Sequence, residues 1–332
     1  MDQVTRLSLT LFLVGAVAVG CAAQPGTTTN SAPAASTSHP TTTIPSATTS
    51  SWTTTTTGSA QAAFPVEVAG VRITARPERV VSLSATHTEM LYAIGAGGQV
   101  IATDQTSNYP QQAQETKKVD SFEPNVEAIA ALRPDLVLVW FDPGDLVASL
   151  RKLEVPTMRF ETAETLEDTY AQIEQLGAAT GHVGEAAELV GRMQSQIEEM
   201  VASAPAWEEA PSYYHELDTG LFTITSDTFA GRLYERLGLV NIADSAEAGQ
   251  YPQLSAEFVI QADPDFIFLA DTKCCGVSAA TVAERPGWDT LTAVQEGRVV
   301  ELDDDVASRW GPRVVDFLRT VAQAVAQFQP VG

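Results

Sequence analysis

The same short sequence pattern occurs twice in this chain. Residues 125–129 (NVEAI) lead to Pro134-Asp135 and an apolar run, and residues 255–259 (SAEFV) lead to Pro264-Asp265 and a second apolar run. Each copy predicts a helix with a glutamate near its start, followed by a buried strand. The repeat therefore predicts two related lobes that face each other.

Helical and strand patterns alternate along most of the remaining chain, which predicts the α/β class. The predicted helices cover 86–95, 125–132, 228–237, 256–261 and 312–328, and the predicted strands cover 80–83, 100–103, 135–140, 213–217, 266–269 and 299–302.

One stretch between the two halves is rich in helix-forming residues. It covers 165–204 and is interrupted around 177–184. Its second part predicts a long helix that joins the lobes. We therefore expect an N-terminal lobe at 64–160, a helical region at 161–205 and a C-terminal lobe at 206–332, with the ligand in the crevice between the lobes.

The first part of the chain predicts export. Residues 7–19 are almost wholly apolar but too few for a comfortable membrane span, which is typical of a secretory signal peptide at 1–20. The small residues before Cys21 resemble the lipobox of bacterial lipoproteins, which implies a lipid on this cysteine; an ordinary signal peptide with an incidental cysteine is the alternative. Residues 21–63 would then be a disordered tether rich in Thr, Ser, Pro and Ala, with a reach of roughly 35 Å.

Composition and motifs exclude several classes of function. The formal net charge of -23 opposes binding to nucleic acid. Neither a G-x-S-x-G elbow nor a Walker loop is present, so we expect no enzyme. We predict no metal site, since His87 and His215 are most simply ordinary polar residues. The adjacent pair Cys274-Cys275 is compatible with a vicinal disulfide, with free thiols or with ligand contact.

Five segments resemble the family of binding proteins for iron chelates and cobalamin: PERVVSLSATHTEMLYAIGAG, TSNYPQQAQ, NVEAIAALRPDLVLVW, YPQLSAEFVIQADPD and WGPRVVDFL. The resemblance implies two Rossmann-like lobes joined by a single long α-helix, the class III periplasmic binding protein fold. It also implies an extracytoplasmic, monomeric solute-binding component of an ABC importer, with no intrinsic cofactor, that works with a membrane permease and its ATPase.

The resemblance to the cobalamin-binding members implies a set of ligand-binding residues, namely Thr106, Phe122, Trp140, Tyr251, Asp305 and Arg309. A corrinoid is a flat macrocycle fringed with amides, which suits aromatic walls and a charged pair. Those members have a tyrosine in place of Thr106 and tryptophans in place of Phe122 and Tyr251. A ferric siderophore or haem is the alternative ligand, and a surface hydrolase is a remote alternative function.

The resemblance also implies that Glu127 and Glu257 dock on arginines of the permease. Simpler explanations exist for the predicted residues. Aromatic side chains commonly pack in cores, and Arg309 could pair locally with the aspartates at 303–305 on the surface. A glutamate in the first turn of a helix is favoured by the helix dipole without any partner.

Overall fold

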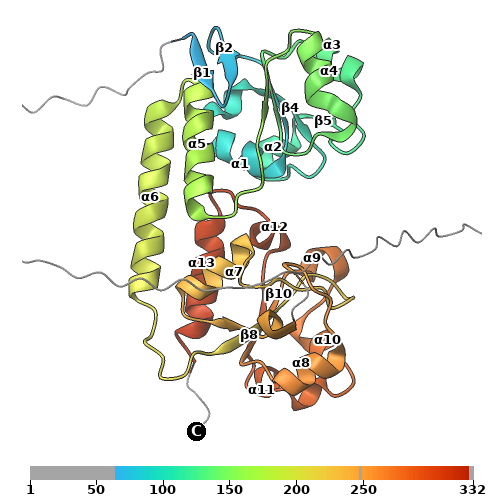
Figure 1. Ribbon diagram of the computed structural model, residues 1–332, viewed down its shortest axis with the longest axis vertical. Helices are drawn as coiled ribbons and strands as arrows, with labels where there is room; N and C mark the ends of the chain where they lie inside the picture. The colour runs from blue at the N-terminus through green and yellow to red at the C-terminus, as the bar shows by residue number, and fades with distance from the viewer. Residues whose placement is uncertain (1–63, 247–248, 329–332) are drawn as a thin grey trace, which may run out of the picture. The chain divides into compact units, whose positions relative to one another are not determined.

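The computed structural model describes residues 64–246 and 249–328 (Figure 1). The predicted signal peptide, the lipidated Cys21 and the tether lie outside these residues. Among the helices that are described, none combines the length and the apolar character needed to cross a membrane.

The N-terminal lobe contains a five-stranded parallel sheet. Its strands are β3 (Val80–Leu83), β4 (Val100–Asp104), β5 (Lys117–Val119), β6 (Leu136–Val139) and β7 (Thr157–Arg159), in the order β5-β4-β3-β6-β7. Every residue of the central strand β3 and of its neighbour β6 is buried, as expected for a sheet covered on both faces. The strand order reverses between β3 and β6, which is the switch point of a doubly wound sheet.

The helices of this lobe are α1 (Ala85–Ala93), α2 (Gln111–Gln114), α3 (Val126–Ala131) and α4 (Leu146–Lys152), and a short antiparallel pair, β1 (Val66–Val68) and β2 (Val71–Ile73), precedes the sheet. The hydroxyl of Ser84 caps the first turn of α1, and Gly95, with a φ of 83°, follows the last turn. This confirms the predicted end of the helix at Gly95, because a left-handed residue there suits glycine.

The C-terminal lobe repeats the arrangement with four parallel strands. They are β8 (Ser212–Glu216), β9 (Val240–Asn241), β10 (Phe266–Leu269) and β11 (Val299–Glu301), in the order β11-β10-β8-β9. Its helices are α7 (Phe229–Arg236), α8 (Ala256–Ala262), α9 (Thr272–Cys275), α10 (Ala279–Ala283), α11 (Thr292–Gln295), α12 (Asp304–Ala307) and α13 (Val314–Val325). The two copies of the sequence repeat form α3 with β6 and α8 with β10, and each second strand borders the switch point of its sheet.

Two helices follow the first sheet: α5 (Leu166–Thr180) and α6 (Val183–Ala202). Gly181, with a φ of 82°, separates them. Helix α5 packs against α1 and β1 of the first lobe, whereas α6 contacts both α5 and α13 of the second (Figure 1). The prediction of one long helix joining the lobes is confirmed, since 20 residues of α-helix span about 30 Å.

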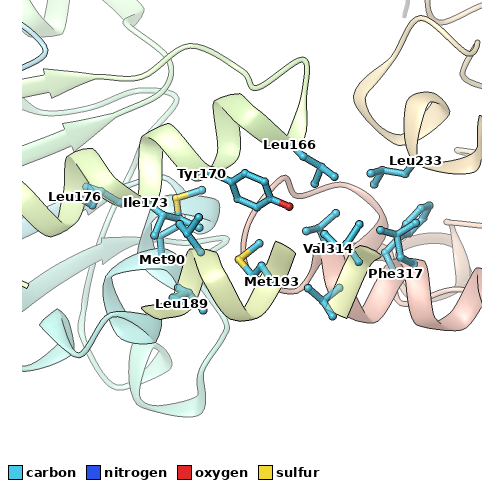
Figure 2. Packing of buried hydrophobic residues seen from close by; sticks show 14 of the residues in the cluster. Met90, Leu166, Tyr170, Ile173, Leu176, Leu189, Met193, Leu233, Val314 and Phe317 are labelled. Atoms are coloured by element: carbon cyan, nitrogen blue, oxygen red, sulfur yellow. The ribbon is translucent and has the colours of Figure 1, made fainter. Parts of the chain in front are cut away.

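One hydrophobic cluster continues from the first lobe through these helices into the second. Figure 2 shows Met90 of α1 and Tyr170 of α5 on one side, and Leu233 of α7 and Phe317 of α13 on the other. Met193 of α6 lies between them and is almost fully buried. Because this core is shared, the two lobes are joined by apolar packing as well as by the covalent connection.

Candidate functional site

The predicted ligand-binding residues follow the carboxyl ends of strands. Thr106 follows β4, Phe122 follows β5, Trp140 follows β6 and Asp305 follows β11. Loops at this edge of a parallel sheet, next to the switch point, form the binding sites of doubly wound folds. The topology therefore places these four residues where a site is expected.

Arg309 joins the two lobes through polar contacts. Its Nη1 donates to Oε1 of Glu89 at 2.6 Å, and its Nη2 donates to the carbonyl oxygen of Thr106 at 3.0 Å. Nη2 also lies 2.6 Å from Oδ1 of Asp305. The side chain is only 9% exposed. Arg309 is therefore not a solvated surface residue, although it does pair locally with Asp305 as the simpler explanation allowed. Three of the predicted residues meet at one point.

Asn108 places a carboxamide between the charged pair. Its Nδ2 donates to Oδ2 of Asp305 at 3.0 Å, and its Oδ1 accepts from Nη1 of Arg309 at 2.9 Å. The amide thus donates to the carboxylate and accepts from the guanidinium at the same time. Asp305 and Arg309 together bind both polar atoms of a primary amide, that of Asn108.

Glu89 of α1 is the buried acceptor of this network and was not predicted from the sequence. Only 3% of the residue is exposed, and besides Arg309 it accepts from Arg313, whose Nε and Nη2 donate at 2.8 and 2.6 Å. The guanidinium of Arg313 lies 4.2 Å from the centre of the Tyr109 ring. A buried carboxylate with two cationic partners is costly to disrupt. The sequence feature that could have indicated Glu89 is its position as a charged residue at the centre of the helix sequence ATHTEMLYA.

The acidic segment before Arg309 is held by a lysine. Nζ of Lys273 lies 2.6 Å from Oδ1 of Asp303 and 3.0 Å from Oδ2 of Asp305. Burial raises the pKa of Asp305, but the hydrogen bond from Lys273 and the charge of Arg309 outweigh it and hold this pKa below its usual value. Asp305 is therefore an ionised acceptor at neutral pH.

The neighbouring Asp304 fixes the start of α9. Its carboxylate accepts from the backbone N–H groups of Thr272, Lys273 and Cys274 at 2.8 to 2.9 Å. Cys274 and Cys275 form a disulfide between adjacent residues, which selects one of the three states that the sequence allowed.

Aromatic rings form a continuous line beside the charged network. The ring of Phe122 lies 6.4 Å from that of Phe141, Phe141 lies 5.9 Å from Trp140, and Trp140 meets Trp310 edge-on at 6.3 Å. Phe122 is 59% exposed and Phe141 is 46% exposed, so neither is a core residue. Phe141 and Trp310 were not assigned from the sequence, although each directly follows a predicted site residue.

A cavity of about 180 Å³ opens below this network in the C-terminal lobe. Arg309, Trp310 and the 58% exposed Tyr251 contribute to its wall. Most of the other lining residues are apolar and come from α7 and from the segment that leads into α13: Phe229, Ala230, Leu233, Val306, Ala307, Val314 and Phe317. All six predicted ligand-binding residues are thus connected, directly or through Phe141, Trp310 and this cavity.

Both histidines considered from the sequence are buried and neutral. His87 contacts the Ser84 hydroxyl through Nδ1 at 2.7 Å and Gln172 through Nε2 at 3.0 Å, and burial lowers its pKa to about 4. Burial lowers the pKa of His215 to about 3, and its Nδ1 lies 2.9 Å from the Tyr234 hydroxyl. Within 64–246 and 249–328, no three His, Cys, Asp or Glu side chains form a group able to hold a metal ion.

Glu127 and Glu257 occupy equivalent places in the two lobes. Each is exposed in the first turn of a helix, α3 or α8, whose N-terminus is capped by Asn125 or Ser255. Each helix begins on the side of its lobe where the strands end, because it runs back to the start of the next parallel strand. Neither glutamate forms an ion pair with any of the described residues.

Comparison with known proteins identifies the family. A model described as "Periplasmic binding protein" matches residues 80–306, which includes both sheets up to α12. The chain belongs to the periplasmic binding protein family. As a periplasmic binding protein of this fold, it is the solute-binding component of an ABC importer, with a permease and an ATPase as membrane partners.

Three similar proteins illustrate the range of the family. The ABC transporter substrate-binding lipoprotein YvrC of Bacillus subtilis strain 168 is 29% identical over 275 residues, covering 79% of this chain and 86% of its own. The structure of the periplasmic vitamin B12-binding protein BtuF of Vibrio cholerae is 29% identical with a TM-score of 0.64, covering 76% of this periplasmic binding protein and 99% of its own chain.

The third is the periplasmic haem-binding protein RhuT of Roseiflexus sp. RS-1. Its structure in the apo form is 23% identical with a TM-score of 0.67, and the match covers 75% of this chain and 97% of that one. At this identity the likeness shows the fold alone. The class III periplasmic binding protein fold that the sequence predicted is confirmed by both structures.

Proposed function

We propose that this protein captures a corrinoid or a closely related amide-bearing metal chelate and delivers it to the permease. The single observation that best supports this ligand class is the amide receptor made by Asp305 and Arg309, which already holds the carboxamide of Asn108. The exposed line of Phe122, Phe141 and Trp140 beside it provides aromatic faces for a flat macrocycle. The vitamin B12-binding relatives support the same class.

The charge around the receptor also favours an amide-fringed ligand over an anionic one. Arg309, Arg313 and Lys273 are the cations of the network, and their ionic partners are Glu89, Asp303 and Asp305, with Asp304 beside them. Three positive charges therefore face four carboxylates. Such a site offers no excess positive charge to an anionic ferric complex or to the propionates of haem.

The cavity itself is smaller than the ligand proposed. Its volume of about 180 Å³ is below the roughly 300 to 1,000 Å³ typical of small-molecule sites. A macrocycle would therefore lie over the mouth of the cavity, in contact with the exposed rings, rather than inside it.

Delivery and anchoring complete the proposal. Glu127 and Glu257 dock on basic residues of the permease, one from each lobe, and a lipid on Cys21 holds the monomeric protein at the outer side of the membrane. The equivalent, exposed positions of the two glutamates support the docking role, and the lipoprotein YvrC supports the anchor.

The ligand is tested by mixing the purified protein with cyanocobalamin, cobinamide, haem or a ferric siderophore. Unbound ligand is removed on a sizing column, and the visible spectrum of the protein fraction is recorded. We expect a retained corrinoid band that Trp140→Ala weakens by about tenfold, since an aromatic face contributes on the order of 1 kcal/mol or more. Trp207→Leu, which changes a tryptophan packed against Phe328 away from the network, is the control.

A retained haem or siderophore band without a corrinoid band would contradict the proposed ligand class. Retention of none of the four would contradict the transport of a metal chelate as a whole.

Docking is tested separately, by uptake of the retained ligand in cells. We expect Glu127→Ala combined with Glu257→Ala to abolish uptake while binding stays unchanged. Glu167→Ala is the matched control, because Glu167 is also exposed in the first turn of a helix but lies outside the sequence repeat. Unchanged uptake in the double variant would show that the glutamates do not dock.

A further inference from the structure

One buried polar group in the cavity wall has no partner. His215 lines the cavity, and among the described residues nothing accepts from or donates to its Nε2. The residue is almost fully buried at 1% exposure. A buried imidazole nitrogen without a hydrogen bond is unfavourable, so the structure retains it at a cost in stability.

The contact of the other ring nitrogen, Nδ1, determines whether Nε2 is a hydrogen-bond donor or acceptor. The hydroxyl of Tyr234 is fully buried, and Nδ1 of His215, 2.9 Å away, is its one partner among the described residues. A buried hydroxyl must donate its proton, so Nδ1 is the acceptor in this contact. His215 is neutral in this environment. The single ring proton of the neutral imidazole is therefore on Nε2, which makes Nε2 an unsatisfied donor.

The rest of the wall favours an apolar guest. The hydroxyl of Thr228 already donates to the carbonyl oxygen of Thr225 and accepts from the N–H of Gly231. The side chains of Leu233, Val314 and Phe317 are apolar and belong to the continuous core. An apolar cavity of about 150 Å³ is known to hold a benzene ring, so the roughly 180 Å³ here accommodates one ring system.

We propose that this cavity is a subsite for one uncharged ring of the transported ligand, and that Nε2–H of His215 donates a hydrogen bond to an acceptor atom on that ring. The inference rests on the proposed transport function for its biological meaning, but the subsite is defined by residues of the C-terminal lobe alone, apart from Thr162. The ring enters past Tyr251 and Arg309 while the bulk of the ligand stays over the mouth. The ligand class is thus narrowed to chelates that bear a projecting neutral heterocycle or cyclic carbonyl group.

The test uses two small rings of the same shape. Indole and benzimidazole are both bicyclic and both carry an N–H, but only benzimidazole adds an acceptor nitrogen. Each is titrated at pH 7.5 into the purified, isotopically labelled protein, and binding is followed by NMR. We expect benzimidazole to bind about tenfold more tightly than indole, since one hydrogen bond to an otherwise unpaired buried donor has about this effect.

Three variants separate the effect of the hydrogen bond from the effect of the cavity volume. His215→Phe keeps a ring of similar size without the donor and should bind both compounds equally. His215→Gln, whose amide nitrogen lies near the position of Nε2, should restore part of the preference. Ala230→Leu fills the cavity from α7 without changing the histidine and should abolish binding of both compounds.

Two results would overturn the subsite: no binding of either ring to the wild type, or a preference for benzimidazole that persists in His215→Phe. Either result would leave the corrinoid experiment unaffected, because that experiment reports on the rim residues. Conversely, a protein that binds benzimidazole through His215 but retains no metal chelate would refute the proposed function and not the subsite. Loss of structure in His215→Phe would be visible in the same spectra, and His215→Gln with Ala230→Leu would then decide the question.

Discussion

A buried carboxyl group in the C-terminal lobe makes the stability of this protein dependent on pH. Asp271 follows β10 and is fully buried, and neither of its carboxyl oxygens has a hydrogen-bond partner among the described residues. The neighbouring Glu216 is also fully buried and is paired with Arg285 through two contacts of 2.7 and 2.5 Å. Burial, followed by the negative charge of Glu216, raises the pKa of Asp271 to about 7.

The direction of the effect follows from where the proton is bound. Below about pH 4, Asp271 is protonated in both the folded and the unfolded chain and has no pH-dependent effect. Between pH 4 and pH 7 the unfolded chain releases the proton while the folded chain keeps it, so the free energy of unfolding falls as the pH rises. Above pH 7 both states are ionised, and the loss is complete.

The size of this loss has an upper limit set by the two pKa values. The pKa of Asp271 rises from its ordinary value of 3.8 to about 7 on folding. Each unit of this difference corresponds to about 1.36 kcal/mol, so the ionised Asp271 lowers the free energy of unfolding by at most about 4 kcal/mol. Asp271→Asn keeps the shape of the protonated carboxyl group and cannot ionise. We therefore expect the variant to gain 2 to 4 kcal/mol over wild type at pH 8 and to match it near pH 4.

Urea unfolding followed by circular dichroism at pH 4, 6 and 8 measures this difference. The exposed Asp289 lies in the same lobe, and Asp289→Asn is the matched control, for which we expect no change at any of the three pH values. A variant that is equally or less stable than wild type at pH 8 would refute the reasoning, because the buried charge would then not be the cause of the loss.

Four further substitutions test the helix packing and the network between the lobes. Glu89→Gln should lower the free energy of unfolding by about 3 to 5 kcal/mol in urea, because it leaves the largely buried side chains of Arg309 and Arg313 without their carboxylate. Gly231→Ala should lower the free energy of unfolding by roughly 1 to 3 kcal/mol, because the added Cβ would lie 2.1 Å from the carbonyl oxygen of Thr225. Gly191→Ala in α6 should instead raise the free energy of unfolding by about 0.5 to 1 kcal/mol, because the added Cβ meets nothing within 4 Å. Asn108→Ala should raise the affinity for an amide-bearing ligand several-fold in a binding titration, because it empties the receptor made by Asp305 and Arg309.

The strands of the fold were predictable where an apolar run follows residues that end the preceding helix. β6 and β10 consist of four buried residues each, and both follow a Pro-Asp pair that ends the preceding helix. β5 was missed because its sequence, KKV, is mostly exposed at the edge of the sheet and shows no strand pattern. β9 was missed because two residues give no periodicity at all.

For the candidate site, the sequence indicated loops but could not indicate the contacts between them. Resemblance singled out Arg309 and Asp305, which lie four residues apart on one segment. Glu89, the buried partner of Arg309, is separated from it by 220 positions, so no local pattern could join them. The cavity is equally non-local, because α7, β8 and the start of α13 form it together.

The contacts of Arg309 restrict the role that we propose for it in ligand binding. In the structure both terminal nitrogens of its guanidinium already donate to groups of the two lobes, including the carbonyl oxygen of Thr106 and the amide of Asn108. A ligand amide that binds these two nitrogens must replace one of these contacts, so the net gain is the difference between two similar hydrogen bonds. In the proposed function, affinity therefore comes mainly from the aromatic faces and the cavity, while the exchange at Arg309 selects ligands that donate and accept as Asn108 does. A ligand that merely displaced Asn108 would weaken the link between the lobes, whereas one that also contacts Trp140 in the first lobe and Tyr251 in the second would restore it.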